Sequence, residues 1–193
     1  MKILRPALVL TLFFVLLTGL AFPFLITAVA QTIFPHQANG SMVMVDGNPV
    51  GSALIGQTFT GEQFFHPRPS NGGYDANNSG GTNLGPTNPK LLEGAEGFDG
   101  VKQLAEQYRA LNGVAAEVVL PVDAVTRSAS GLDPHISVDN ARLQAARVAR
   151  INGVDKGEIE EMIANLTEVP LLGLGEKPYV NVLLLNQKVA QMP

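Results

Sequence analysis

A long uncharged stretch near the start of the chain constrains the fold more than any other feature. No Asp, Glu, Lys or Arg occurs between Arg5 and Asp46, and residues 7–30, ALVLTLFFVLLTGLAFPFLITAVA, are almost entirely apolar. At 1.5 Å of rise per residue, a helix of this length extends about 36 Å, which crosses a hydrocarbon core of about 30 Å with some tilt. The sequence therefore predicts one membrane-spanning helix over about residues 7–30.

A cleaved secretory signal is the alternative interpretation of the same stretch. Lys2 and Arg5 form a positive flank, and the Ala-Val-Ala of residues 28–30 matches the small-residue rule for cleavage. The apolar core of a signal usually has about 7 to 15 residues and is followed by a polar segment, whereas this run is longer and lacks one. We therefore expect a retained anchor of residues 1–34, followed by one domain of residues 35–193.

The charges around the apolar run predict its orientation. Lys2 and Arg5 precede it, whereas the first charge after it is Asp46, so the positive-inside bias places the N-terminus in the cytoplasm and the domain outside. Without those two cations, 11 basic residues remain beside 17 acidic ones, which gives the exported part a formal charge of −6. A surface of that sign does not favour nucleic acid or anionic lipid. The absence of cysteine excludes disulfide bonds and thiolate metal sites.

The rest of the chain predicts a small mixed α+β domain. Turn residues around a Met-Val run in residues 34–48 predict a hairpin or edge strand, and dense Gly and Pro predict an irregular segment at 65–89. Strands are expected from aliphatic runs at residues 51–59, 117–126 and 179–185. Helices with capping residues are expected at residues 89–112, 137–151 and 155–166. Asn88 is the expected N-cap of the first helix, and three glycines after residue 93 favour an early break.

The motifs of common catalytic classes are missing from the sequence. It contains no GxxxxGK[ST] or GxGxxG phosphate loop and no HExxH, and Asp155-Lys156-Gly157 only begins like the DKTG of transport ATPases. The three histidines, His36, His66 and His135, are far apart. Asp133 beside His135 is compatible with a metal or acid–base site, since imidazole titrates near neutral pH. The favoured alternative is a turn in which Asp133 caps backbone groups.

Three serines lie close to the same Asp and His in the string SASGLDPHIS. Ser128, Ser130 and Ser137 suggest a nucleophile only by sequence adjacency, which is not the geometry of a triad, and there is no GxSxG elbow. Hydrolase chemistry is therefore not favoured.

Several long strings, in order along the chain, carry a family resemblance. They are GSALIGQTF at 51–59, FFHPRPS at 64–70, SGGTNLGPTNP at 79–89, LPVDAVTRSASGLDPHIS at 120–137, QAARVAR at 144–150 and VNVLLLN at 180–186. LRPAL at 4–8 and FPHQANGS at 34–41 fit as well. On these strings the chain resembles the KdpC family, the small subunits of Kdp potassium-transporting ATPases, nearly from end to end.

The resemblance implies a noncatalytic subunit of a bacterial inner-membrane complex. Its partners would be a channel-like potassium-translocating subunit, a P-type ATPase subunit and a small single-span subunit. The family is described as a catalytic chaperone that raises the ATP affinity of the hydrolysing subunit. The positions expected to contact nucleotide are Ser79, Gly80, Gly81, Asn83 and Gln144. The positions expected to dock on partners are Thr11, Thr18, Gly19, Pro23, His66, Arg68, Asp133 and His135.

The predicted topology conflicts with direct nucleotide binding, because a domain outside the cytoplasm meets little ATP. A stabilising role through the membrane helix, or a cap over the external potassium entrance, agrees better with an acidic exported domain. We therefore expect no metal and no firmly bound cofactor, with ATP used through the complex. Loop 79–89 is expected to be a docking turn, with an anion cradle or a plain linker as alternatives. For the whole chain, an independent membrane-anchored periplasmic binding protein or hydrolase is the alternative.

Overall fold

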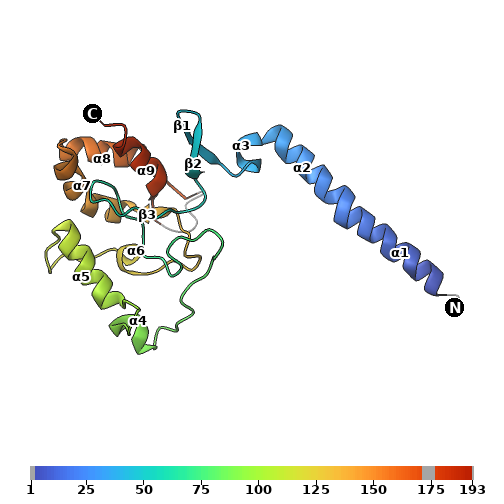
Figure 1. Ribbon diagram of the computed structural model, residues 1–193, viewed down its shortest axis with the longest axis horizontal. Helices are drawn as coiled ribbons and strands as arrows, with labels where there is room; N and C mark the ends of the chain where they lie inside the picture. The colour runs from blue at the N-terminus through green and yellow to red at the C-terminus, as the bar shows by residue number, and fades with distance from the viewer. Residues whose placement is uncertain (1–2, 171–176, 193) are drawn as a thin grey trace. The chain divides into compact units, whose positions relative to one another are not determined.

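The computed structural model describes residues 3–170 and 177–192 (Figure 1). The chain divides into two compact units, Met1–Ser52 and Ala53–Pro193.

One long helix forms most of the first unit. Helix α1 (Leu4–Leu16) continues through one π-helical turn (Leu17–Ala21) into α2 (Phe22–Ile33). The whole apolar helix spans 30 residues, and its most apolar stretch of 18 residues has a mean hydropathy of 2.5, so the helix is long and apolar enough to cross a membrane. The wide turn precedes Pro23, whose ring has no N–H to donate and would clash with the preceding turn of a regular α-helix. The predicted apolar helix is confirmed and is a few residues longer at each end.

A short helix and a hairpin complete the first unit. Helix α3 (Pro35–Ala38) is followed by strands β1 (Met42–Val45) and β2 (Asn48–Ser52), which pair antiparallel. Asp46 and Gly47 form the two-residue loop, both with positive φ (49° and 79°), as the favoured hairpin turn requires. The predicted hairpin is therefore confirmed.

The buried strand predicted at 51–59 is wrong, because only Gly51 and Ser52 belong to a strand. Beyond them the chain enters a segment without helix or strand that runs to Asn88 and includes the predicted irregular stretch. Gly56 is buried there, and its N–H donates to Leu132 O at 2.8 Å. A Cβ at this position would lie 2.6 Å from a backbone oxygen, so the run packs against an irregular loop.

The first predicted helix of the second unit is present and broken early. Helix α4 (Pro89–Glu93) is capped by Asn88, whose Oδ1 accepts from Lys90 N–H at 3.0 Å, and it ends at Gly94. Helix α5 (Val101–Asn112) then begins after Gly100 and ends at Gly113 in the left-handed conformation (φ 64°). The Asn88 cap and the glycine break are both confirmed.

The strand predicted at 117–126 is wrong. Helix α6 (Val122–Val125) follows Pro121, and residues 115–121 before it contain no helix or strand. Thr126 Oγ1 donates to Val122 O at 2.7 Å, which ends the short helix with a polar contact. A local turn with its own hydrogen bonds replaces the pairing that a strand would need.

A three-stranded antiparallel sheet lies beside the last helices, with the order β3-β5-β4. Its strands are β3 (His135–Ser137), β4 (Thr167–Glu168) and β5 (Tyr179–Asn181), and Val180 pairs with both Ile136 and Thr167. The strand predicted at 179–185 ends after Asn181. Asn181 Oδ1 accepts from Leu184 N–H at 3.2 Å and caps helix α9 (Val182–Val189), so the assignment of 182–185 to a strand is wrong.

Helices α7 (Val138–Asn152) and α8 (Lys156–Asn165) confirm the remaining predictions, with Ser137 and Asp155 as their caps. Figure 1 shows α7, α8 and α9 grouped together in the second unit. Their apolar faces and the sheet enclose a core that includes Phe65, Ile136, Ala141, Ala145, Val148, Ile159, Ile163, Val180 and Leu185. The α+β class predicted from the sequence is confirmed.

Candidate functional site

The irregular segment around Phe65 and His66 passes through the core without a partner strand. Phe65 N–H donates to Asn186 Oδ1 (2.7 Å), and Asn186 Nδ2 donates to Phe65 O (2.8 Å). In the same way, His66 N–H donates to Gln144 Oε1 (2.8 Å), and Gln144 Nε2 donates to His66 O (3.0 Å). We call Gln144 and Asn186 the amide clamp. Its two side chains satisfy buried backbone groups as a neighbouring strand would.

A buried arginine reinforces the clamp. Arg147 is 1% exposed, and its Nη2 donates to Gln144 Oε1 at 2.9 Å, while its Nε donates to Asn112 Oδ1 at 2.8 Å. Its Nη1 donates to the carbonyls of Glu62 and Phe64. Burial lowers the pKa of Arg147, yet these neutral oxygens satisfy the cation from several sides. The clamp is thus a saturated network.

Gln144, which the family resemblance assigns to nucleotide, is therefore part of the core. Its side chain is 1% exposed, and Asn140 Oδ1 accepts the remaining amide hydrogen at 3.0 Å. Its side-chain hydrogen-bond partners are His66, Asn140 and Arg147, and the loop residues 79–83 are not among them. A nucleotide contact at Gln144 would require the clamp to open, and this assignment stays a prediction.

The glycine-rich loop is held against a second glycine-containing string. Gly80 N–H donates to Ser130 O at 2.8 Å, and Ser79 Oγ donates to the same oxygen at 3.2 Å. A Cβ at Gly81 would lie 3.0 Å from Ala129 O, so the missing side chain allows two backbones to meet. Asn83 has a left-handed backbone (φ 56°), which Asn tolerates better than most residues. This geometry accounts for the glycines by packing, and the docking and nucleotide assignments of the loop stay predictions.

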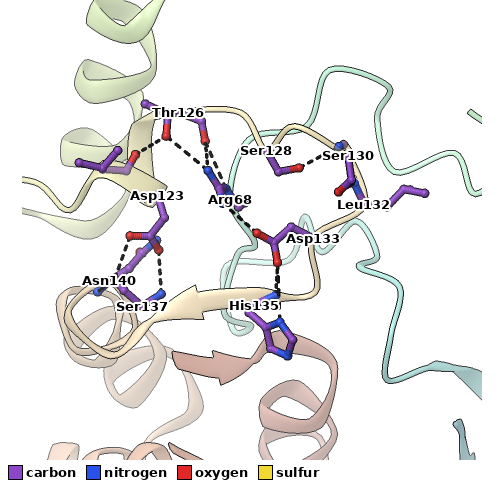
Figure 2. Close-up of polar contacts among 12 residues, drawn as sticks. Arg68, Asp123, Thr126, Ser128, Ser130, Leu132, Asp133, His135, Ser137 and Asn140 are labelled. Carbon is purple, nitrogen blue, oxygen red and sulfur yellow. Dashed lines mark hydrogen bonds and ion pairs between the residues drawn. The ribbon is translucent and has the colours of Figure 1, made fainter. Parts of the chain in front are cut away.

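Arg68 and Asp133 form the centre of a polar network, which Figure 2 shows. Arg68 Nη1 donates to Asp133 Oδ2 at 2.8 Å, and the two side chains are 17% and 25% exposed. Asp133 Oδ1 accepts from His135 N–H at 3.0 Å, the capped turn favoured from the sequence. The His135 ring packs on Tyr179, with centroids 4.6 Å apart. Within residues 3–170 and 177–192, no group of three or more His, Cys, Asp or Glu could hold a metal ion.

A second network around Asp123 fixes the start of α7 (Figure 2). Its carboxylate accepts from Ser137 N–H and Ser137 Oγ, both at 2.8 Å, and from Asn140 Nδ2 at 2.9 Å. Tyr108 Oη donates to Asn140 Oδ1 at 2.8 Å. Ser128 Oγ and Ser130 Oγ accept from the backbone N–H groups of Gly131 and Leu132. These serines serve caps and turns, which favours the structural alternative over a nucleophile.

His66 contributes its backbone to the clamp and its ring to a neighbouring loop. The ring Nε2 lies 3.1 Å from Gly61 O, so this nitrogen donates a proton there in the neutral ring. Burial lowers the pKa of His66, against the carbonyl of Gly61, which raises it. The side chain is half-buried and already engaged within the second unit.

The predicted docking residues of the long helix are all exposed in the first unit. Thr18 Oγ1 donates to Phe14 O at 2.7 Å, which satisfies its hydroxyl within the helix. Thr11 lies two turns before Thr18 on the same face, and nothing lies within 4 Å of a Cβ built at Gly19. Pro23 follows the π turn. Small and self-satisfied residues allow another helix to approach closely, and docking here stays a prediction.

A groove of about 710 Å³ adjoins both polar networks. Asp123, Asp133, His135 and Ser137 contribute to its polar lining. Val119, Val122, Arg142 and Lys177 also line it, and none of these was selected from the sequence. The only signal was an aliphatic run at 118–122, which was assigned to a strand. We call this cavity the side groove.

Comparisons with known proteins agree from one end of the chain to the other. The family described as "KdpC: K+-transporting ATPase, c chain" matches residues 4–191. A protein of Polaromonas naphthalenivorans, described as a potassium-transporting ATPase KdpC subunit, is 52% identical over 96% of this chain and 92% of its own length. Proteins with the same description from Mycobacterium tuberculosis strain H37Rv (48% identical, 95% of each chain) and Sorangium cellulosum (50% identical, 95% of this chain and 94% of the relative) match as fully. The chain therefore belongs to the KdpC family and is a KdpC subunit of a potassium-transporting ATPase.

Proposed function

We propose that this chain is an accessory, noncatalytic subunit of an ATP-driven potassium importer in a bacterial inner membrane. The observation that carries the proposal is the family match over residues 4–191, which includes the long apolar helix. Cations precede that helix and no charge follows it before Asp46, so the N-terminus lies in the cytoplasm and the folded domain outside. The sequence contains no phosphate-binding motif of its own, so ATP hydrolysis belongs to a partner.

The proposed partners are a channel-like potassium-translocating subunit, a P-type ATPase subunit and a small single-span subunit. The chain stabilises their assembly through its membrane helix, whose exposed face around Thr11, Thr18 and Gly19 suits close helix packing. Its domain caps the external potassium entrance, where a formal charge of −6 raises the local cation concentration. By holding the assembly together, it promotes ATP use by the hydrolysing subunit.

A direct ATP contact is the second form of the chaperone proposal. It would use the loop residues Ser79, Gly80, Gly81 and Asn83, because Gln144 is enclosed in the amide clamp. The test is calorimetry of the full chain with ATP, comparing the native chain with Asn83→Ala. Saturable binding that Asn83→Ala abolishes supports a nucleotide site at the loop, and its absence leaves ATP to the partner subunit alone.

Orientation is tested by single cysteines, since the chain contains none of its own. Ala76→Cys lies on an exposed part of the irregular segment, and Ile3→Cys lies at the other end of the span. In intact spheroplasts an impermeant maleimide should label Cys at position 76 and should label position 3 only after permeabilisation. The reverse pattern would overturn the extracytoplasmic assignment.

Subunit function is tested by co-purification and uptake. When expressed with the other subunits, the tagged chain should elute with them from detergent, and cells that lack it should lose potassium uptake at low external potassium. A chain that elutes alone while uptake is normal would instead be an independent anchored protein. ATP titration of the complex with and without the chain measures the chaperone role as a change in apparent ATP affinity.

A further inference from the structure

We propose that the side groove binds an extended segment of a partner subunit in which an aliphatic side chain lies next to a carboxylate. This inference rests on the proposed function, because it needs a partner in a complex. It adds the place on this chain and the chemistry of the segment.

The aliphatic side chains beside the groove are unusually exposed. Val119 is 89% exposed and Val122 is 73% exposed, although both are branched aliphatic residues. They line the same cavity together with the partly buried Leu120 and Pro121. Removing such surface from water is favourable in proportion to its apolar area. The groove therefore offers a contact for an aliphatic side chain.

The charged side chains that line the groove indicate which charged group the ligand should carry. Asp123 accepts from Ser137 and Asn140, and Asp133 is paired with Arg68. Asp139 lies 3.8 Å from Lys177, an exposed pair that contributes little.

The Arg142 side chain is exposed, and within residues 3–170 and 177–192 it has no hydrogen bond or ion pair. Arg142 thus gives the groove a cation that is available to a ligand. A guanidinium binds a carboxylate by two parallel hydrogen bonds.

The shape of the cavity favours a segment over a compact ligand. A second hollow of about 360 Å³ adjoins the first, and both are lined by Ser137, Asp139, Arg142 and Lys177. Arg142 therefore lies where the two hollows meet, as expected for a cation that binds the middle of an extended segment. Both hollows are open to the surface, so a loop can enter from the side.

Strand addition to β3 is disfavoured, although β3 is an edge of its sheet. Asp133 Oδ1 takes the N–H of His135, and Asp123 Oδ2 takes the N–H of Ser137. These two donors would otherwise face an added strand, and acidic side chains now block them. Recognition in the groove therefore depends on the side chains Val119, Val122 and Arg142.

Site-specific photocrosslinking in the assembled transporter identifies the occupant. Benzoylphenylalanine placed at Val119 should crosslink to one peptide of a partner subunit, and mass spectrometry should find Asp or Glu beside Leu, Ile or Val in it. Val169 is the matched control, since it is 71% exposed in an irregular segment and does not line the groove. Crosslinks to lipid or to a second copy of this chain, equal crosslinks from both positions, or none from position 119 would overturn the proposal.

Substitutions measure the contribution of the groove to assembly. Arg142→Glu, and Val119→Ser combined with Val122→Ser, should each reduce retention of the chain in the complex by about tenfold or more, as for central interface residues. Arg150→Glu is the matched control, because Arg150 is exposed two turns further along α7 and outside the groove. Thermal unfolding of each full chain should match the native chain. If the native chain co-purifies and the groove variants are retained equally, the groove proposal fails alone; if the native chain does not co-purify, the proposed function fails first.

Discussion

Replacing Gln144 by Ala tests what holds the second unit together. The side chain is 1% exposed and makes four hydrogen bonds, two with the backbone of His66 and one each with Asn140 and Arg147. Asn140 Oδ1 keeps its bond from Tyr108, and Arg147 keeps its other acceptors. The two backbone groups of His66 therefore lose most in the Gln144→Ala variant.

The size of the loss follows from these contacts. A buried polar group left without its partner costs about 1–3 kcal/mol, and two such groups give about 2–6 kcal/mol. Water can reach part of the half-buried His66, which reduces this sum, whereas the space left by the side chain adds to it. We expect Gln144→Ala to lower the free energy of unfolding by about 3–5 kcal/mol, a large share of the 5–15 kcal/mol typical of a domain.

The measurement is denaturant unfolding of the full chain in detergent, followed by the near-ultraviolet circular dichroism of its three tyrosines. Gln107→Ala is the matched control, because Gln107 is an exposed helical residue with one side-chain bond, to Asp99 at 3.1 Å. That variant should change the free energy by less than about 0.5 kcal/mol. Equal unfolding of the two variants would refute the clamp and would leave the Gln144 amide free for a ligand.

Three further predictions concern other contacts of the second unit. Because burial lowers the pKa of His66, the unfolded chain binds a proton at this residue at a higher pH than the folded chain does, so the free energy of unfolding should fall as the pH drops below about 6.5. Urea unfolding at several pH values should show that this free energy depends less steeply on pH in His66→Gln than in the native chain. The same pH dependence in both would contradict the prediction. Gly56→Ala places a Cβ 2.5 Å from a tyrosine ring carbon and should lower the free energy of unfolding by about 1–3 kcal/mol, as measured by thermal unfolding. Gly80→Ala is the control and should be neutral, because nothing lies within 4 Å of its Cβ. Equal effects of the two substitutions would refute the packing argument. Arg68→Ala should lower the free energy of unfolding by about 2–3 kcal/mol, because Asp133 loses its counter-charge. A double-mutant cycle with Asp133→Ala should show a coupling energy of about 1 kcal/mol or more. Additive losses would rule the pair out as a stabilising contact.

Helix boundaries were predictable wherever one residue sets them through a local contact. Asn88, Ser137 and Asp155 each accept a backbone N–H two or three residues ahead, so their effect is visible within four letters of sequence. Gly113 ends a helix with a positive φ, which only the local backbone decides. The 30-residue apolar helix needed no partner to be recognised, because length and hydropathy alone define it.

The three aliphatic runs predicted as strands are wrong in whole or in part, and the reason is physical. A short aliphatic run fits a buried strand and a buried helix equally well, and its packing partners decide between them. In residues 182–185 the Asn181 cap and the core beneath α9 favour helix, and Leu185 is fully buried there. In residues 117–121 the side chains of Val118 and Val119 remain exposed, and no neighbouring strand pairs with this run among the described elements.

The candidate site depends on contacts that one sequence cannot display. Arg68 and Asp133 lie 65 residues apart, and His66 and Gln144 lie 78 residues apart. The local part was predictable: Asp133 two residues before His135 caps its N–H, as Asp commonly does in turns. The amide clamp has no local signature, since a buried Gln and an exposed Gln look alike in a helical sequence.

The amide clamp and the side groove are connected through two residues of chain. The clamp holds the backbone of His66, and Arg68 then reaches Asp133 in the wall of the groove. Loosening the clamp should therefore weaken partner binding as well as folding, although Gln144 itself is buried. Arg142→Glu should weaken binding without unfolding the chain, because Arg142 is exposed. A loss of complex function in Gln144→Ala thus indicates that the groove has lost its structural support. Comparison with Arg142→Glu separates this indirect effect from the loss of a direct ligand contact.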